Sequence, residues 1–502
     1  MPTASPQDLP ESSPWSRTTV FAALLVLGAG IGAWAHGPGI DVPYYGDDFQ
    51  LYFPALGMDW TDHFVRTGPT TGFYRPLQNA ALSVIQSAAG MNPVPVHVLT
   101  LLLHVGTVAV VYEGSRWIGA SRVQAVVAAV LMAVAQVNAA AVLGNDTLSQ
   151  VGSTLFGYLS LRCYGQVVSG RRAARTAYAG ALTALAVALL FKESAFAFVP
   201  LLVLMEVAAA PGGWGAQASL TVRAGRLAPV LVLAAGYLLL RGAAGAMSPG
   251  FGSGPYQLAL GGNVIRNAAL FGVAATSVVP TPQVAGWAQT GQWAHVAAAG
   301  AGSLGLVTAV GWGVYRSGRG RTAAALLAGS LASLAPVLAL NDVSELYVYT
   351  AMPPLCILAA LAAGPWLHAA SSRQRAVVAA LLLGVVVTQA VGVRHKAALM
   401  DATGKRTQAV LKQVAETAAA APDDAWLCLQ DASPPTADPD TTAYSVYRMP
   451  GALPLIFAEP VVRHLASRPD VHFTTAMPSC PPEATVLRVR SDGWTVRRDA
   501  AH

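Results

Sequence analysis

The chain has 502 residues, of which 54% are hydrophobic and 11% are charged, and its mean hydropathy is +0.48. A soluble domain carries about a quarter charged residues, so this composition excludes a soluble globular protein and indicates an integral membrane protein. The formal net charge is +6, but the basic residues stand in short loops between apolar runs. The positive-inside rule accounts for them, so we expect membrane lipids and no nucleic acid as partners.

Residues 18–36 form the first apolar run, and Arg17 precedes it. The tripeptide Ala33-Trp34-Ala35 resembles a signal-peptide cleavage site. However, the polar leader is long and the run is as long as a membrane span. We therefore expect a retained anchor, with residues 1–17 as a cytoplasmic tail.

Further apolar runs reach the length of about 20 residues that a helix needs to cross a bilayer. They are residues 95–113, 122–143, 147–165, 176–191, 194–210, 226–242, 295–315, 322–340, 348–367 and 376–393. Arginines mark every second loop as cytoplasmic. Between the external loop after 242 and the cytoplasmic loop at 316 only an odd number of crossings is possible, but two apolar runs, 262–280 and 295–315, lie there. The run 262–280 contains Asn263, Arg266 and Asn267, so we expect it to be an external or half-buried helix.

These patterns predict an all-α polytopic membrane domain at 18–393, with about 11 transmembrane helices and a first external loop at 37–94. Residues 394–502 are more polar and predict a small external α/β domain. It would contain a helix at 405–421 and strands at 426–429, 471–474 and 485–489. The amino terminus is then cytoplasmic and the carboxyl terminus external.

Four cysteines without a CxxC spacing exclude a zinc site or a disulfide-rich scaffold. Cys163 and Cys356 fall in or beside apolar runs and are expected to be packing residues. Cys428 and Cys480 are the two cysteines of the tail, which this topology places in an oxidising compartment. We expect a disulfide between them, and two separate buried thiols are the alternative.

The same topology gathers unusual polar residues on the outer side, where ionisable groups near hydrocarbon usually face a cavity. Each also has an ordinary interpretation, as a solvated loop acid, a snorkelling cation, a hydrogen-bonded helix residue or a member of an interfacial aromatic belt. The set comprises Asp47, Asp48, Arg75, His97, His104, Asn145, Asp146, Lys192, Glu193, Arg266, Glu345 and Tyr347.

The order of these residues resembles the GT-C polytopic glycosyltransferases, over roughly residues 40–365. An acidic pair is followed by Tyr74-Arg75-Pro76-Leu77, by two histidines seven residues apart, by Phe191-Lys192-Glu193-Ser194 and by a late segment at 344–349. The nearest branch is the bacterial relatives of the transmembrane-and-tetratricopeptide (PMT-like) O-mannosyltransferases. The sequence departs from that branch at 135–138, where both histidines of a His-Pro-x-His segment are missing, at Leu346, which replaces an arginine, and in lacking the repeats.

The resemblance implies an inverting transfer of a sugar from a polyprenyl-phosphate-linked donor to a protein, glycan or lipid acceptor. The reaction would occur on the outer face of a membrane, which we expect to be the bacterial inner membrane. Asp47 would be the catalytic base, and Asp48 would orient it or contact the acceptor. The two are also the candidate ligands for a divalent cation, Mg²⁺ or Mn²⁺. Arg75 and Lys192 would neutralise the departing lipid phosphate.

Two other functions fit a polytopic chain with an external tail. A transporter or flippase for a lipid-linked sugar would favour charges at mid-membrane and internal repeats, and the sequence has neither pattern. A non-catalytic scaffold would use the bundle only as an anchor for the tail. Transfer activity separates the glycosyltransferase from both.

Overall fold

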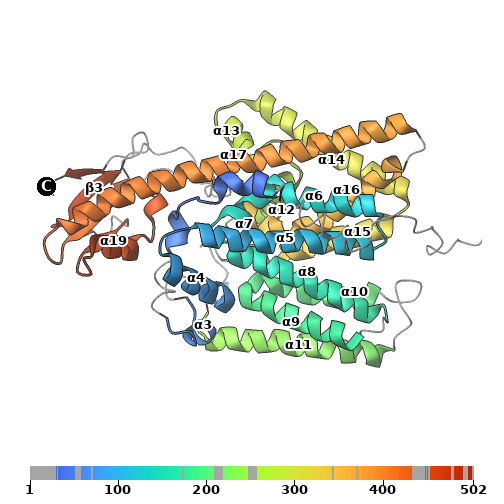
Figure 1. Cartoon of the computed structure of the whole chain (residues 1–502), viewed down its shortest axis with the longest axis horizontal. Helices are drawn as coiled ribbons and strands as arrows, with labels where there is room; N and C mark the ends of the chain where they lie inside the picture. The colour runs from blue at the N-terminus through green and yellow to red at the C-terminus, as the bar shows by residue number, and fades with distance from the viewer. Residues whose placement is uncertain are drawn as a thin grey trace, which may run out of the picture.

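The computed structural model describes residues 30, 32–50, 58–68, 72–170, 174–208, 219–246, 257–341, 344–368, 371–431, 447, 449, 453–475, 480–489 and 496–499. Most of the predicted first span, at 18–36, lies outside these residues. The described chain is a helical bundle with a small sheet at one end, and the long helix α17 connects the two (Figure 1).

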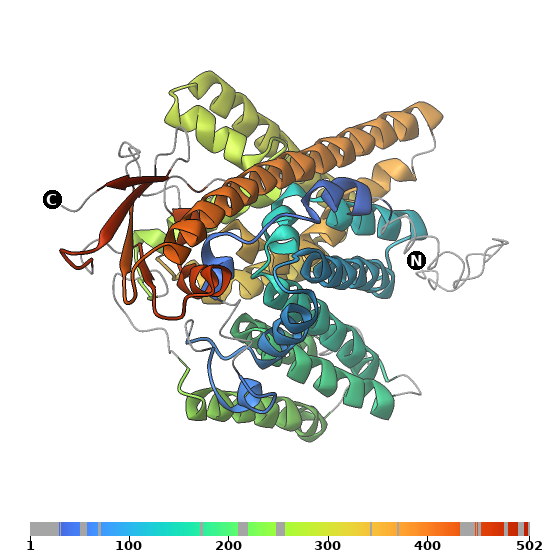
Figure 2. The same ribbon diagram turned by 60° about the vertical axis from the view of Figure 1, so that its left-hand side comes forward.

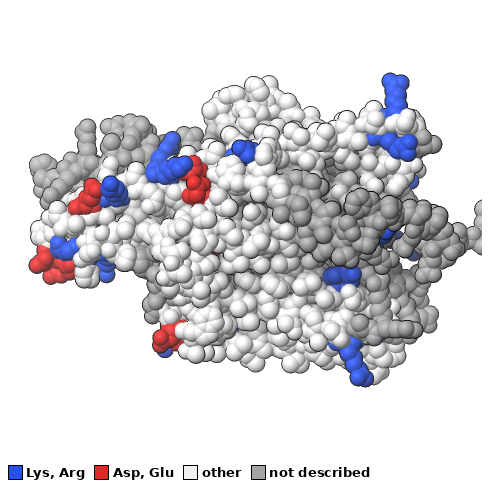
Figure 3. Space-filling model, in the orientation of Figure 1, with Lys and Arg blue, Asp and Glu red and all other residues white. Residues whose placement is uncertain are grey.

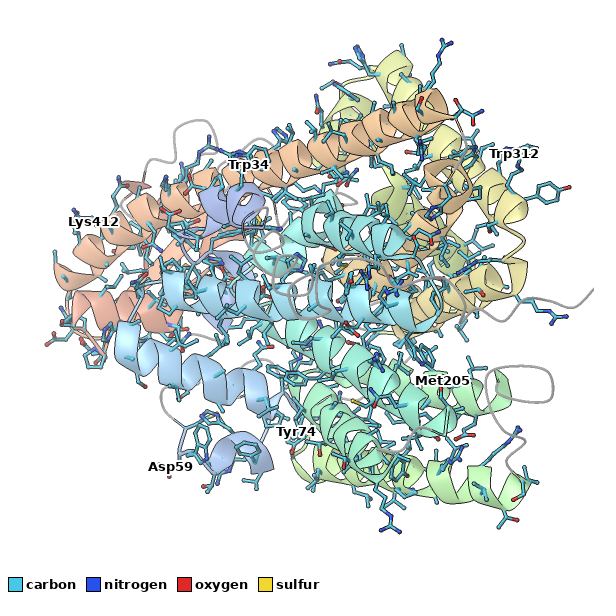
Figure 4. All side chains as sticks on the ribbon, turned by 45° about the vertical axis from the view of Figure 1, so that its right-hand side comes forward. Trp34, Asp59, Tyr74, Met205, Trp312 and Lys412 are labelled. Atoms are coloured by element: carbon cyan, nitrogen blue, oxygen red, sulfur yellow. A yellow bond between two sulfur atoms is a disulfide. The ribbon has the colours of Figure 1, made fainter. Side chains whose placement is uncertain are left out.

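The bundle is built on helices whose long sides are apolar. Helix α8 (Leu148–Val168) packs on α5 (Val94–Trp117) and α9 (Ala174–Phe191), and α16 (Met352–Leu367) lies against α6 (Arg122–Val134). The outer helices are α10 (Phe198–Ala208), α11 (Leu220–Ala243), α12 (Gly262–Thr276), α13 (Thr281–Gln289), α14 (Trp293–Ser317) and α15 (Gly320–Leu338). Figure 4 shows Trp312 on the outer side of α14, and its side chain is 54% exposed. Such apolar exposure is expected where a helix faces lipid.

Among the described residues, seven helices are long and apolar enough to cross a membrane, or eight when a bent pair is counted as one span. The predicted total of about eleven is not confirmed. Helix α10 has 11 residues, and α12 has 15 residues within the predicted half-buried run at 262–280. At 1.5 Å per residue, α12 is about 22 Å long, which is shorter than the hydrocarbon core.

The predicted span at 122–143 is bent rather than straight, because the helix breaks at Ala135. Helix α6 ends there, and the 3₁₀ turn η3 (Gln136–Asn138) and α7 (Ala139–Leu143) continue at an angle of 43°. The break is stabilised by side chains: Asn138 Nδ2 donates to Met132 O over 2.8 Å, and Gln136 N donates to Gln389 Oε1 over 2.9 Å. A helix break inside a membrane bundle needs such partners for the freed backbone groups.

The predicted separation of the span at 376–393 from a helix at 405–421 is wrong. One helix, α17, runs unbroken from Ser372 to Ala419 over 48 residues, about 72 Å. The sequence from 372 to 419 contains no proline, and the helix buries apolar residues against both the bundle and the tail. The continuous helix therefore joins the bundle to the carboxyl-terminal part (Figure 2).

The tail forms a four-stranded sheet in the order β2-β1-β3-β4. Strands β1 (Trp426–Asp431), β2 (His472–Thr474) and β3 (Thr485–Val489) are parallel, and β4 (Val496–Asp499) is antiparallel to β3. The three predicted strands are present, and β4 is additional. Helix α19 (Glu459–Ala466) and the end of α17 pack together, and a disulfide joins Cys428 of β1 to Cys480.

Two residues of the first loop belong to the apolar core of the tail. Tyr44 and Phe49 are 2% and 1% exposed, and they pack with Val410, Leu411 and Leu455. The short elements of this region are η1 (Gly37–Gly39), η2 (Gly46–Asp48), α3 (Asp62–Val65), α4 (Pro76–Ala89) and η7 (Leu453–Leu455). The residues that flank the acidic pair are therefore packed into the apolar core of the tail.

Charge is distributed unevenly between the two ends of the molecule. On the face shown in Figure 3, Asp and Glu lie toward the end that carries the sheet, whereas the opposite end displays Lys and Arg alone. A surface of this kind on the cytoplasmic side is typical of membrane proteins.

Candidate active site

The acidic pair forms the tight turn η2, in which the two carboxylates have different surroundings. Asp48 is 7% exposed, and its Oδ2 accepts hydrogen bonds from Tyr45 N and Asn145 Nδ2, both over 3.0 Å. Asp47 is exposed. Gly46 opens the turn with φ of +58°, a conformation that glycine adopts without strain. The turn thus holds one acid inward and leaves the other accessible.

Asp146 is the second inward-facing acid. Burial raises the pKa of Asp48 well above its usual range, and the negative charge of Asp146 raises it further. Burial also raises the pKa of Asp146, whereas Lys192 and Arg75 act to lower it. These mutual effects indicate one electrostatic cluster, which we call the rim cluster. It comprises Asp47, Asp48, Asp146, Arg75, Lys192 and Glu193.

Arg75 and Glu193 form a bidentate ion pair in this cluster. Arg75 Nε donates to Glu193 Oε2 over 3.1 Å, and its Nη2 donates to Oε1 over 2.8 Å. The guanidinium also lies 4.2 Å from the centroid of the Phe73 ring. Burial raises the pKa of Glu193, but the attraction of Arg75 outweighs it and lowers the pKa to about 2. Glu193 therefore stays ionised and fixes the orientation of Arg75.

Arg75 and Glu193 meet because one helix begins and another ends at the same place. Pro76 starts α4, so the preceding Arg75 is non-helical, with φ of −134°. Helix α9 stops at Phe191, and Lys192 is extended before the 3₁₀ turn η4 (Glu193–Ala197). Both charged residues thus lie at the rim of the bundle.

Lys192 is 6% exposed, and the charge of its side chain varies with pH near neutrality. Burial and the neighbouring charge of Arg75 lower the pKa of Lys192 to about 7, although Glu193 and Asp146 oppose the shift. Its Nζ lies 5.4 Å from the centroid of the Tyr347 ring. Tyr347 therefore belongs to this site, through the face of its ring.

The two histidines lie on one side of α5, as their seven-residue spacing predicts, and both are buried. His97 Nε2 lies 3.2 Å from Val42 O, and His104 Nδ1 lies 2.8 Å from the hydroxyl of Tyr349. These contacts connect α5 to the first loop and to the 3₁₀ turn η5 (Glu345–Ala351). The contacts agree with the ordinary interpretation of His97 and His104 as hydrogen-bonded helix residues.

Two predicted residues lie in other surroundings. Arg266 is on α12, and its Nη2 donates to Asn341 O over 3.2 Å at an exposed position. Glu345 is 2% exposed and lies in a separate buried cluster, where Lys396 Nζ is 2.8 Å from each of its carboxylate oxygens. Thr281 Oγ1 donates to Glu345 Oε1 over 2.7 Å, and the hydroxyl of Tyr447 donates to Oε2.

This second cluster contains residues that the sequence analysis did not single out. Lys396 also donates to Gln136 O over 3.0 Å, so its three donors are all used. An uninterrupted helix beyond residue 393 would have placed a lysine inside an apolar segment, which is a strong signal. No such signal existed for Thr281 or Tyr447. In the part of the chain that the structure describes, no group of three His, Cys, Asp or Glu could hold a metal ion.

Figure 4 places Tyr74 where α4 meets the bundle, next to Arg75 in the sequence. Tyr74 is 1% exposed, its hydroxyl donates to Phe64 O over 2.8 Å, and its ring packs near Tyr237 of α11. The neighbouring Arg75 is thereby attached to the bundle by an aromatic anchor.

No family model and no curated protein matches the sequence. Among solved structures, the Archaeoglobus fulgidus oligosaccharyltransferase tethered with an acceptor peptide aligns with a TM-score of 0.50 and 14% identity, covering 87% of this chain and 64% of that one. The helical arrangement is similar to that of this oligosaccharyltransferase. Because this chain spans less than two thirds of the oligosaccharyltransferase and the identity is low, the likeness shows the fold alone.

Two further solved structures were found. ArnT from Cupriavidus metallidurans in the apo state aligns with a TM-score of 0.49 and 13% identity, covering 94% of both chains. The A. fulgidus oligosaccharyltransferase AglB in complex with an inhibitory peptide and a dolichol-phosphate aligns with a TM-score of 0.49 and 13% identity, covering 95% of this chain and 70% of that one.

Proposed function

We propose that the protein is an integral membrane glycosyltransferase that transfers a sugar from a polyprenyl-phosphate-linked donor to an acceptor at the outer face of the membrane. The observation that carries this proposal is the rim cluster, which combines two cations, Arg75 and Lys192, with the exposed acid Asp47 through Asp146 and Asp48. A lipid-linked sugar phosphate needs the same two features, because an anionic group leaves while an acceptor group loses a proton.

Asp47 is the proposed base. A group that takes a proton from the acceptor must be reachable, and Asp47 is the exposed member of the pair. As its carboxylate accepts the proton, the acceptor oxygen or nitrogen attacks the anomeric carbon, and the carbon–oxygen bond to the phosphate breaks on the opposite face. The configuration inverts, and the polyprenyl phosphate leaves with the bonding electrons.

Asp48 is proposed to position the base. Its Oδ2 is occupied by Tyr45 N and Asn145 Nδ2, so it fixes the turn and is poorly placed to receive a proton from outside. Burial, followed by the charge of Asp146, raises its pKa, as expected for an acid that faces inward. An optional divalent cation, Mg²⁺ or Mn²⁺, would be held by Asp47 and Asp48.

Arg75 and Lys192 are proposed to receive the phosphate of the donor. Glu193 holds the guanidinium by two hydrogen bonds and so fixes the direction in which its positive charge is presented. Lys192 supplies a second positive charge when it is protonated, and Tyr347 stabilises that charge by a cation–π contact. Charge-assisted contacts of this kind are strong where water is excluded.

We propose that the acceptor is a protein, a glycan or a lipid. The sugar and the acceptor of the PMT-like O-mannosyltransferases are not carried over, because this sequence departs from that branch at 135–138 and at Leu346. We propose the bacterial inner membrane as the location, with the amino terminus in the cytoplasm and the sheet domain outside. The Lys and Arg side chains displayed at the end opposite the sheet support this orientation.

The proposal is tested in cells that lack the protein. Mass spectrometry of glycoproteins, glycans and lipids should find a glycosylated species that is restored by the wild type and not by Asp47→Asn expressed at the same level. Restoration by Asp47→Asn, or no species that depends on the gene, would exclude the proposed function.

A further inference from the structure

We propose that Tyr447 is a positioning residue, which holds Glu345 and the η5 turn so that Tyr347 remains over the Lys192 ammonium. The inference rests on the proposed function, because Lys192 is there a ligand of the donor phosphate. It assigns the carboxyl-terminal part of the chain a role in donor binding.

The contact between Tyr447 and the bundle is direct and buried. Tyr447 has 0% exposure, and its hydroxyl donates to Glu345 Oε2. Its ring faces Lys396 Nζ at 5.0 Å from the centroid, and its carbonyl is 3.4 Å from Thr403 Oγ1 of α17. A residue far along the sequence therefore completes the shell of an ion pair inside the bundle.

The η5 turn transmits this contact to the rim cluster. Glu345 is its first residue, Tyr347 follows two residues later, and Tyr349 contacts His104. The turn is a single short 3₁₀ segment, and its first side chain is held by three donors, Lys396, Thr281 and Tyr447. A short segment that is fixed at its start has little freedom two residues on, so the position of the Tyr347 ring depends on the Glu345 carboxylate.

A second contact of the same segment supports the inference. Met449 lies against Gly46, and a Cβ placed on Gly46 would be 2.8 Å from the Met449 sulfur. Gly46 begins the turn that carries Asp47 and Asp48. Two nearby residues of the tail, Tyr447 and Met449, therefore touch the turn that carries Tyr347 and the turn that carries the two acids.

The test compares two variants that remove one donor from the same carboxylate, Tyr447→Phe and Thr281→Val. The matched control is Tyr178→Phe on α9. It removes a tyrosine hydroxyl that donates to Arg226 O of α11 over 2.6 Å. The probe is undecaprenyl phosphate, whose dissociation constant is measured for each purified protein, together with the donor KM, kcat and melting temperature.

We expect Tyr447→Phe and Thr281→Val to weaken undecaprenyl phosphate binding and to raise the donor KM by roughly five- to tenfold, with a smaller change in kcat. The factor is smaller than for a lost contact to the phosphate itself, because the removed hydrogen bond acts on the donor only through Glu345 and Tyr347. Tyr178→Phe should leave both constants unchanged, and melting temperatures should stay close to that of the wild type.

Unchanged binding in both variants would overturn the inference while leaving the proposed function intact. An equal loss in Tyr178→Phe would also overturn it, because the effect would then be a general loss of stability. If the wild type itself does not bind undecaprenyl phosphate, the proposed function fails, and the inference fails with it.

Discussion

The substitution Lys396→Met removes one partner of the buried ion pair on α17. The side chains of Lys396 and Glu345 are 0% and 1% exposed, and their charged atoms are 2.8 Å apart. Methionine keeps the unbranched apolar stem but removes three donors, so the Glu345 carboxylate stays buried without a cation. Breaking such a pair from one side costs about 3–5 kcal/mol of folding free energy.

The magnitude converts to a shift in melting temperature. With an unfolding entropy of about 2 cal/mol/K per residue, a chain of this size loses about 1 °C per kcal/mol, so we expect a decrease of about 3–5 °C. Unfolding is followed with a thiol-reactive dye, because the buried Cys356 becomes accessible only when the bundle opens.

Two comparisons make the result specific. Lys405→Met is the matched control, since Lys405 lies on the same helix and pairs with Asp401 at the same 2.8 Å, but its side chain is 66% exposed. An exposed pair contributes about 0–1 kcal/mol, so little change is expected. The double variant Glu345→Gln/Lys396→Met should recover at least half of the lost stability. Equal melting of Lys396→Met and wild type would refute the buried pair.

The remaining predictions concern the rim cluster and the tail. Lys192→Met and Arg75→Ala should each weaken undecaprenyl phosphate binding by about ten- to hundredfold, because charge-assisted bonds contribute about 1.5–3 kcal/mol. The control Arg66→Ala, which changes an exposed arginine, should leave binding unchanged. Unchanged binding in both test variants would mean that Lys192 and Arg75 are interfacial anchors. The pKa of Lys192 is lowered to about 7, so its ammonium is charged below this pH, and undecaprenyl phosphate binding should weaken as pH rises above it. Lys192→Arg should make binding less dependent on pH, because arginine stays charged. The same pH dependence in both proteins would contradict the role of Lys192 as a phosphate ligand. Non-reducing peptide mapping of native membranes should recover Cys428 and Cys480 as one linked peptide. On the chain-entropy model, the 52-residue separation predicts that the bond contributes about 4 kcal/mol to the free energy of unfolding. Free alkylatable thiols at both positions would disprove the bond.

The sequence was most informative where charge or polarity interrupts an apolar run. Lys192 and Glu193 end one helix and Arg75 precedes another, so positive-inside topology was enough to predict that they share one side of the bundle. The strands near Leu427 and Leu487 were predicted because short apolar stretches stand out in a polar tail.

The sequence was least informative where tertiary contacts decide. The helix break at Ala135 lies in a run without proline or glycine, and side chains from distant segments stabilise it. Lys396 was missed because hydropathy ends the span at residue 393, whereas the helix continues and buries the charge against Glu345. Tyr447 is 102 residues from its partner, and no local pattern predicts that pairing.

The central claim is tested most directly by sugar transfer in a purified system. The protein is reconstituted in liposomes with a radiolabelled polyprenyl-phosphate sugar and a membrane extract that supplies acceptors, and the label in the acceptor fraction is counted. Wild type and Asp59→Asn, a substitution of an exposed acid of the same loop, should transfer the label (Figure 4). Asp47→Asn should be slower by about 10²–10⁴-fold, as expected when a general base is lost. Near-normal transfer by a folded Asp47→Asn protein would contradict the assigned base, and no transfer by the wild type from any polyprenyl-phosphate sugar would contradict the claim itself.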